Sequence, residues 1–222
     1  IPAGTAAGRP RSARYTARMT QTARTILNDV FGYPEFRGHQ EQAIAAAMAG
    51  RDSLVLQPPG GGKSLCYQIP ALLQDGVDMV VSPLIALMHD QGISLEQLGI
   101  DAAYLNSSLG RDEQRSVLER LRDNRLQLLY VAPERLMQQQ TLAELKAAKV
   151  SLIAIDEAHC VSQWGHDFRE DYLALGELAR EFPGVPRMAL TATATARARE
   201  EIIERLELSD PAQFIASFDR PN

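Results

Sequence analysis

The sequence has no long apolar run, only two cysteines and a single tryptophan. No stretch approaches the ~18 to 20 uncharged residues that cross a bilayer, which excludes a membrane-inserted protein. The first residues also lack the apolar segment of a secretory signal. Cys66 and Cys160 form no C-x-x-C pair, so the pattern favours a reduced cytosolic chain. A disulfide between the two cysteines stays an alternative without support.

Acidic residues are absent from the start of the chain, where residues 1–20 hold four arginines among Gly, Ala and Pro. This composition predicts a flexible leader, and Met19 is a candidate natural start, with the preceding residues added to the natural protein. The chain as a whole has a formal net charge of -5. An acidic body argues against binding nucleic acid by bulk charge, but it leaves room for a local groove.

Short apolar runs alternate with segments of helical period from about residue 53 onward. Runs that are apolar almost throughout are typical of parallel strands covered on both faces, so we expect an α/β fold with helices on both faces of a mostly parallel sheet. The expected strands cover residues 53–57, 78–82, 102–105, 127–131, 151–155, 187–191 and 213–216. The expected helices cover residues 22–31, 39–49, 111–122, 171–182 and 195–208, and Gly50 is expected to end the second in a left-handed conformation.

The segment QPPGGGKS, residues 57–64, lies between an expected strand and an expected helix. This is the context of a phosphate-binding loop, although Gln57 stands where the usual pattern has glycine. Proline has no N–H, so the donors to phosphate must come from residues 60–64. Lys63 would reach the outer phosphates and Ser64 would bind magnesium. The alternative is a glycine-rich turn with a solvated lysine.

Two acids, Asp156 and Glu157, follow the expected strand 151–155 in the sequence DEAH. An acid at this position is suited to hold Mg²⁺ beside a phosphate loop, and Glu157 is suited to activate water. A helix cap would explain the same two acids. Because no asparagine is followed by lysine, the guanine-reading N-K-x-D pattern is absent, and the nucleotide is expected to be ATP.

The ordered motifs GGGKSLCYQ, SPLIALMHDQ, YVAPERL, IDEAHCVSQWGHDFR and ALTATAT resemble the RecQ family of DNA helicases, in helicase superfamily 2. The resemblance runs from about Leu27 to Asn222 and implies the first RecA-like domain of a motor that hydrolyses ATP. It implies an adenine-recognition motif with Tyr33, Arg37 and Gln40, in which the glutamine amide would read the base edge. Standing alone, Tyr33 would equally suit a local core.

The resemblance also implies residues that face DNA or couple it to ATP. The segment after DEAH is similar to an aromatic-rich loop in which bases stack on aromatic rings. A lone tryptophan in the core is the alternative for Trp164, and zinc binding near His159 and Cys160 fits no standard spacing, so no zinc is expected. Pro83 and Pro133 are each expected at the first position of a helix. The implied DNA-side and coupling residues are Ser82, Arg135, His159, Trp164, His166, Phe168, Arg169, Thr191 and Thr193.

Some family features differ or are missing. Pro59 and Gln57 replace the threonine and the methionine or small residue that are usual there, which puts nucleotide affinity in doubt. Residues 21–212 are expected to form the domain, and 213–222 a linker towards a second RecA-like domain. The family's arginine in that second domain would raise the rate by ~10³ to 10⁵. Without it, this chain should not unwind DNA.

The resemblance implies 3′ to 5′ DNA unwinding in repair and recombination, with single-stranded DNA, forks and junctions as partners. A single-stranded DNA-binding protein is a further expected partner. The expected location is the cytoplasm and nucleoid in a bacterium or the nucleus in a eukaryote. An RNA helicase or another superfamily 2 translocase, and a nucleotide-gated binding module without hydrolysis, are the alternatives.

Overall fold

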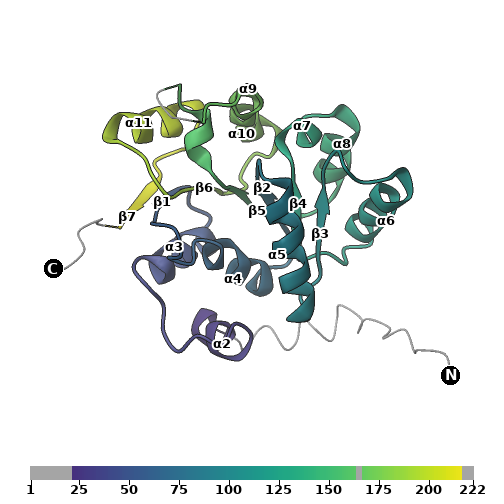
Figure 1. Cartoon of the computed structure of the whole chain (residues 1–222), viewed down its shortest axis with the longest axis horizontal. Helices are drawn as coiled ribbons and strands as arrows, with labels where there is room; N and C mark the ends of the chain where they lie inside the picture. Colours follow the sequence, from purple (N-terminus) through teal and green to yellow (C-terminus); the bar gives the residue numbers. More distant parts are fainter. Residues whose placement is uncertain (1–21, 164–166, 217–222) are drawn as a thin grey trace.

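The structure, a computed structural model, describes residues 22–163 and 167–216. Seven parallel strands form one sheet in the order β3-β4-β2-β5-β6-β1-β7 (Figure 1). The strands are β1 (Ser53–Leu56), β2 (Val77–Val81), β3 (Ala102–Leu105), β4 (Leu128–Val131), β5 (Val150–Ile155), β6 (Arg187–Thr191) and β7 (Ala212–Ile215). The expected parallel sheet is confirmed, and β6 lies between β1 and β5, whose carboxyl ends carry the phosphate loop and the DEAH acids.

Helices cover both faces of the sheet (Figure 1). One face carries α2 (Ala23–Asp29), α3 (Gln40–Met48), α4 (Leu65–Leu73) and α5 (Ile85–Gln97). The other carries α6 (Arg111–Arg122), α7 (Pro133–Leu136), α8 (Gln139–Ala147), η1 (Ala158–Val161), α9 (Glu170–Leu173), η2 (Ala174–Glu177), α10 (Leu178–Glu181) and α11 (Ala196–Arg205). Within the described residues, none of these helices has the length and apolarity needed to cross a membrane.

The core divides into two clusters because successive strand residues point to opposite faces. On β2, Met79 and Val81 belong to the cluster that includes residues of α6, α8 and α11, whereas Val80 belongs to the cluster that includes residues of α3 and α4. All five residues of β2 are buried, as the continuous apolar run predicts. The edge strand β7 differs, because its residues alternate between half-buried and exposed. It is therefore not covered on both faces.

Several expected elements match closely, and three differ. Helix α6 has the predicted bounds, and Gly50 has the predicted positive φ of 73° after α3. The single helix expected over 171–182 is wrong, because the chain forms α9, η2 and α10 in succession. Gly176 lies so close to the Arg205 carbonyl that an added Cβ would be 2.4 Å from it. Packing against the end of α11 therefore sets the path of this segment.

Two further differences concern the ends of elements. Pro133 occupies the first turn of α7 as expected, but Pro83 does not begin a helix, because α5 starts at Ile85 after an extended Leu84. The expected domain boundary at residue 212 falls inside β7, which pairs with β1 up to Ile215. Ala216 then donates to the Leu56 carbonyl. The domain therefore includes residues 213–216, and the expected linker can begin only after them.

A buried ion pair ties the amino ends of two central strands together. Asp52 accepts hydrogen bonds from the backbone N–H of Arg187 at 2.8 Å and from its guanidinium at 2.7 Å. The same carboxylate accepts from the N–H of Ser209 at 2.7 Å, and Arg187 also donates to the Leu206 carbonyl. Both side chains are at most 8% exposed. The pair fixes β1, β6 and the turn after α11 at the edge opposite the phosphate loop.

Candidate nucleotide site

The phosphate loop follows β1 as a tight turn that leads into α4. The N–H of Gly61 donates to the Pro58 carbonyl at 3.0 Å, so it is used inside the turn and does not join the phosphate donors that the sequence predicted. Gly60 and Gly62 have φ values of 76° and 77°, which favour glycine. Among the described residues, no hydrogen-bond acceptor faces the N–H groups of Gly60, Gly62, Lys63 and Ser64. These four are the donors available to an anion at the start of α4.

Two glutamine side chains hold the loop from behind. Gln40 donates to the carbonyls of Gly61 and Gly62 at 3.0 and 3.1 Å, and Gln57 donates to the Gly61 carbonyl at 2.5 Å. In a trans peptide the C=O and the following N–H point in opposite directions. Drawing these carbonyls to one side therefore turns the N–H groups of Gly62 and Lys63 to the other. The glutamines orient the donors without touching an anion themselves.

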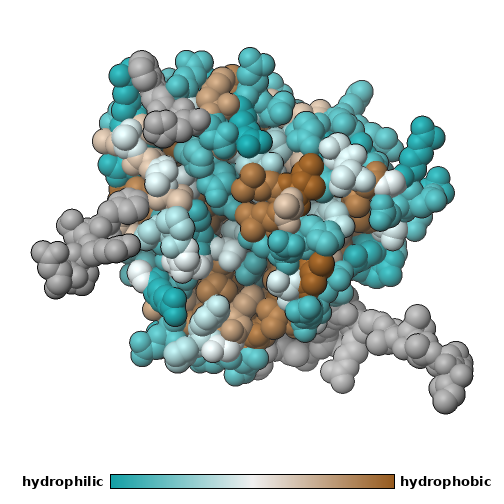
Figure 2. Space-filling view, viewed as in Figure 1, coloured by the Kyte–Doolittle hydropathy of each residue, from teal (hydrophilic) through white to brown (hydrophobic). Residues whose placement is uncertain are grey.

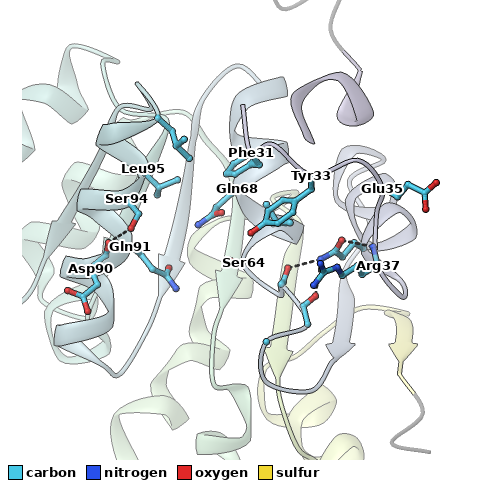
Figure 3. A pocket seen from close by; sticks show the side chains of 16 residues that line it. Phe31, Tyr33, Glu35, Arg37, Ser64, Gln68, Asp90, Gln91, Ser94 and Leu95 are labelled. Carbon is cyan, nitrogen blue, oxygen red and sulfur yellow. Dashed lines mark hydrogen bonds between the residues drawn. The ribbon is translucent and has the colours of Figure 1, made fainter. Parts of the chain in front are cut away.

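A pocket of about 320 Å³ opens beside the loop. Figure 3 shows Gln91 and Ser94 of α5 on one side of the pocket and Gln68 and Tyr33 across from them, with Arg37 beside Ser64 and Glu35 turned away. The Arg37 guanidinium lies 5.9 Å from the centre of the Tyr33 ring, and Tyr33 is 44% exposed. The structure thus gathers all three predicted adenine residues at one pocket. A volume near 300 Å³ suits a small ligand.

The pocket also includes residues that the sequence analysis missed. They come from α4 and α5, namely Gln68, Asp90, Gln91, Ser94, Leu95 and Leu98. Three of them, Gln68, Asp90 and Gln91, lie within GGGKSLCYQ and SPLIALMHDQ, motifs that the sequence analysis assigned to phosphate and to DNA. The sequence motifs therefore marked these residues as functional but did not link them to the base. Only the folded chain brings α5 to the same pocket as the adenine-recognition segment.

The two DEAH acids lie near Lys63 and are not among the residues that line the pocket. The Lys63 Nζ is 4.0 Å from Glu157 Oε1, and the two side chains are only 15% and 22% exposed. Glu157 has a φ of 49°, a left-handed conformation that is strained for a residue with a side chain. Tyr172, a further residue that the sequence analysis missed, donates its hydroxyl proton to the Asp156 carbonyl at 2.9 Å. The Tyr172 side chain of α9 thus supports the turn that presents Glu157.

His159 connects Glu157 to the end of β6. Its Nδ1 lies 2.9 Å from the Thr191 hydroxyl and 3.3 Å from Glu157 Oε2. The Thr191 hydroxyl donates to the Thr193 carbonyl, so it accepts from His159, and the hydrogen-bond network places the imidazole proton on Nδ1. Thr191 is fully buried, whereas Thr193 is exposed. His159, Thr191 and Thr193 thus form one hydrogen-bonded network that contacts Glu157, the candidate general base.

The Asp156 carboxyl carries an unfavourable charge in this structure. Burial is the main cause that raises its pKa to about 6, and the nearby Glu157 carboxylate contributes to this rise, while Lys63 and the Glu157 N–H oppose it. A bound cation would offset this repulsion between neighbouring carboxylates. The donor set therefore fits a divalent ion held by Asp156 together with Ser64, whose side chain makes no capping hydrogen bond.

Replacing Asp156 by asparagine should stabilise the metal-free chain above pH 7. The folded state binds the Asp156 proton more tightly than the unfolded state, so wild-type stability is lost as the pH rises from 3.8 to about 6. That shift corresponds to about 3 kcal/mol, and asparagine avoids the charge. We expect urea unfolding in EDTA to show Asp156→Asn more stable by about 1 to 3 kcal/mol at pH 8.

The advantage of this variant should shrink as the pH falls from 6 towards 4, because the wild-type carboxyl is then protonated. Asp75→Asn at an exposed site is the matched control and should show no such pH dependence. An Asp156→Asn chain that is no more stable than wild type at pH 8 would contradict the expected charge burial.

The predicted DNA-side residues differ in how far the structure describes them and in how exposed they are. Trp164 and His166 lie outside the described residues. Phe168 and Arg169 are partly exposed beyond η1, and Arg169 lies 3.5 Å from Asp167. Ser82 is only 2% exposed, and its hydroxyl accepts from the Leu84 N–H. Arg135 donates to Gln114 and Gln138. Their roles towards DNA stay predictions.

Apolar side chains also reach the surface along α5. Figure 2 shows brown patches in the middle of the face where Figure 1 places this helix. The exposed apolar residues there are Leu84, Ile85, Ile93 and Leu98. Leu84 and Ile85 belong to the SPLIALMHDQ motif, so the start of α5 presents apolar surface at the carboxyl edge of the sheet.

One group of metal-ligand types lies near the site. Ligand atoms of His159, Cys160 and Asp167 come within 4.8 Å of one another among the described residues. Burial raises the pKa of the Cys160 thiol to about 12, which disfavours the thiolate that zinc requires. The absence of zinc stays a prediction, and His159 is already engaged with Thr191.

Comparison with known proteins agrees with this site. Residues 37–202 match the model of the DEAD/DEAH box helicase family. The chain therefore belongs to this family, which is defined by a phosphate loop and a DEAD or DEAH segment on a RecA-like sheet.

Among its relatives, the chain is 52% identical to the ATP-dependent DNA helicase RecQ of Pasteurella multocida over 92% of this chain. It is 51% identical to that of Haemophilus influenzae. The resemblance to RecQ helicases is thus confirmed. The chain spans about a third of the length of these two curated relatives, 32% of each.

Solved structures show the same fold at low identity. A DNA-bound DUF1998 helicase, MrfA, aligns with 91% of this chain and 29% of its own at a TM-score of 0.68 and 18% identity. A hypothetical ATP-dependent RNA helicase from Sulfolobus tokodaii aligns with 92% of this chain and 57% of its own at a TM-score of 0.65 and 17% identity. Both likenesses confirm the RecA-like architecture alone.

Proposed function

We propose that the chain is the ATP-binding motor domain of an ATP-dependent DNA helicase that moves 3′ to 5′ and acts in DNA repair and recombination. One observation carries the proposal. The lysine of the phosphate loop and the strained Glu157 lie within 4.0 Å of each other at the start of α4. A site that only binds nucleotide needs no such acid beside the outer phosphates, so hydrolysis is favoured over a nucleotide-gated binding module.

Each residue of the site would have a separate role in ATP binding or hydrolysis. The N–H groups of Gly62, Lys63 and Ser64 would bind the phosphates, and the Lys63 ammonium would offset the charge that develops on the outer one. Glu157 would orient the attacking water and accept its proton. His159, held by Thr191, would keep Glu157 in place and report its state to the end of β6. Mg²⁺, held by Ser64 and Asp156, would supply charge neutralisation.

The substrate and partners follow from the family. The two relatives named above are called DNA helicases, and we infer single-stranded DNA, forks and junctions as substrates. A single-stranded DNA-binding protein would be a partner, and the location would be the nucleoid of a bacterium or the nucleus of a eukaryote. The partly exposed Phe168 and Arg169 support a DNA-facing role for the segment after DEAH.

The test compares ATP hydrolysis with and without nucleic acid. In an enzyme that extends this chain to the length of its relatives, single-stranded DNA should raise ATP turnover more than tenfold, and RNA of the same sequence should not. The 222-residue chain alone should bind ATP weakly, hydrolyse it very slowly and respond little to DNA, because the arginine of a second domain is absent.

Three outcomes would count against parts of the proposal. Equal stimulation by RNA would favour an RNA helicase or another superfamily 2 translocase. ATP binding without turnover in the extended enzyme would favour the binding module. Robust DNA-stimulated turnover by the 222-residue chain would mean that the catalytic site is complete within this domain.

A further inference from the structure

Two glutamine amides converge on one carbonyl of the phosphate loop. Gln40 and Gln57 both donate to the Gly61 oxygen, at 3.0 and 2.5 Å. Carbonyl oxygens only accept, so the NH₂ group of each amide must face the loop. The exposed fraction is 2% for Gln40 and 5% for Gln57. Both amide side chains are therefore buried, and their hydrogen bonds to the half-buried loop are partly shielded from water.

Gln40 has no spare donor while it holds the loop. Its two N–H groups are used by Gly61 and Gly62, and its Oε1 accepts from the Arg37 N–H at 2.8 Å. Reading an adenine edge takes one donor and one acceptor of the amide. Gln40 therefore cannot hold both carbonyls and read the base at the same time.

Gln57 is placed to keep the loop in shape when Gln40 turns away. Its side chain lies flat against the loop, where a Cβ on Gly61 would be 2.7 Å from Gln57 Cγ. Its backbone N–H donates to the Thr191 carbonyl at 3.1 Å, which anchors it to β6 and not to the nucleotide pocket. Gln57 does not line the pocket, so no contact to the base competes for its amide.

We propose that Gln57 is a positioning residue that retains the Gly61 carbonyl and so frees Gln40 to recognise adenine. The inference rests on the proposed function, because it assigns adenine to Gln40. A donor at residue 57 lets base recognition proceed without leaving the partly buried Gly61 carbonyl unpaired, which would weaken binding. Residue 57 thereby sets how strongly the base contributes to affinity.

The test separates binding of the base from binding of the phosphates. Isothermal titration calorimetry on the 222-residue chain would compare Mg-ATP with Mg-tripolyphosphate, which has no base and leaves Gln40 on the loop. Gln57→Met keeps the side-chain volume and removes the donor. We expect the Kd for ATP to rise about tenfold and the Kd for tripolyphosphate to change less than about twofold.

The matched control is Gln140→Met on the exposed surface of α8, which should change neither Kd. Gln57→Asn keeps an amide but shortens its reach, and it should give the same split if Gln57→Met does not fold. An equal loss for both ligands would assign Gln57 a merely structural role and overturn the inference, as would an unchanged Kd for ATP. A wild-type chain that binds neither ligand would overturn the proposed function and this inference with it.

Discussion

Replacing Lys63 by alanine should lower ATP turnover by roughly 10²- to 10³-fold in the enzyme that contains this domain. Among the described residues, Lys63 is the only lysine near the loop, and its side chain is 15% exposed, so its charge acts in a partly desolvated site. Alanine removes the cation that would face the outer phosphates. It also removes the charge that lowers the pKa of Asp156, so the Asp156 pKa should rise further.

The measurement is steady-state ATP hydrolysis with saturating single-stranded DNA. Lys146→Ala is the matched control, because it removes a lysine from the exposed surface of α8, where the ammonium pairs only with Glu181. That control should hydrolyse ATP at the wild-type rate. An unchanged rate for Lys63→Ala would mean that the phosphate loop is not the catalytic site.

Replacing Asp52 by alanine should destabilise the domain by about 3 to 5 kcal/mol. The change leaves the Arg187 guanidinium buried with the Leu206 carbonyl as its remaining partner among the described residues, and it deprives two backbone N–H groups of their acceptor. An uncompensated buried charge costs far more than the loss of an exposed pair. The effect should appear although Asp52 lies at the opposite edge of the sheet from the nucleotide site.

Urea unfolding gives the free energy directly, and an unchanged m-value would show that the compactness of the two states is preserved. Glu41→Ala breaks the exposed pair with Arg24 and should cost less than about 1 kcal/mol. A loss below about 1 kcal/mol for Asp52→Ala would contradict the importance of this ion pair.

The helices and strands could be predicted from the sequence where the local sequence alone determines the secondary structure. The strands are continuous apolar runs, and helix α6 lies between Gly110 and a basic last turn, so its predicted bounds match. The helix expected over 171–182 failed because close contact between Gly176 and the end of α11 is not visible in the segment itself. The same holds for β7, whose pairing with β1 places residues 213–216 inside the domain.

The sequence by itself determined the class of protein and the residue types of the site. A glycine-rich loop after a strand and a DEAH segment after another strand sufficed, because each motif is short and carries its own chemistry. Only the tertiary structure decided how these motifs meet.

The order β5-β6-β1 places Thr191 between the two motifs, and the turn at Glu157 brings its carboxylate to Lys63. The role of Gln57 was also invisible in sequence, where it read as a departure from the pattern. The hydrogen bond from Gln57 to Gly61 depends on the path of the backbone through the loop. Contacts of this kind arise from distances in the folded chain, which spacing along the sequence does not fix.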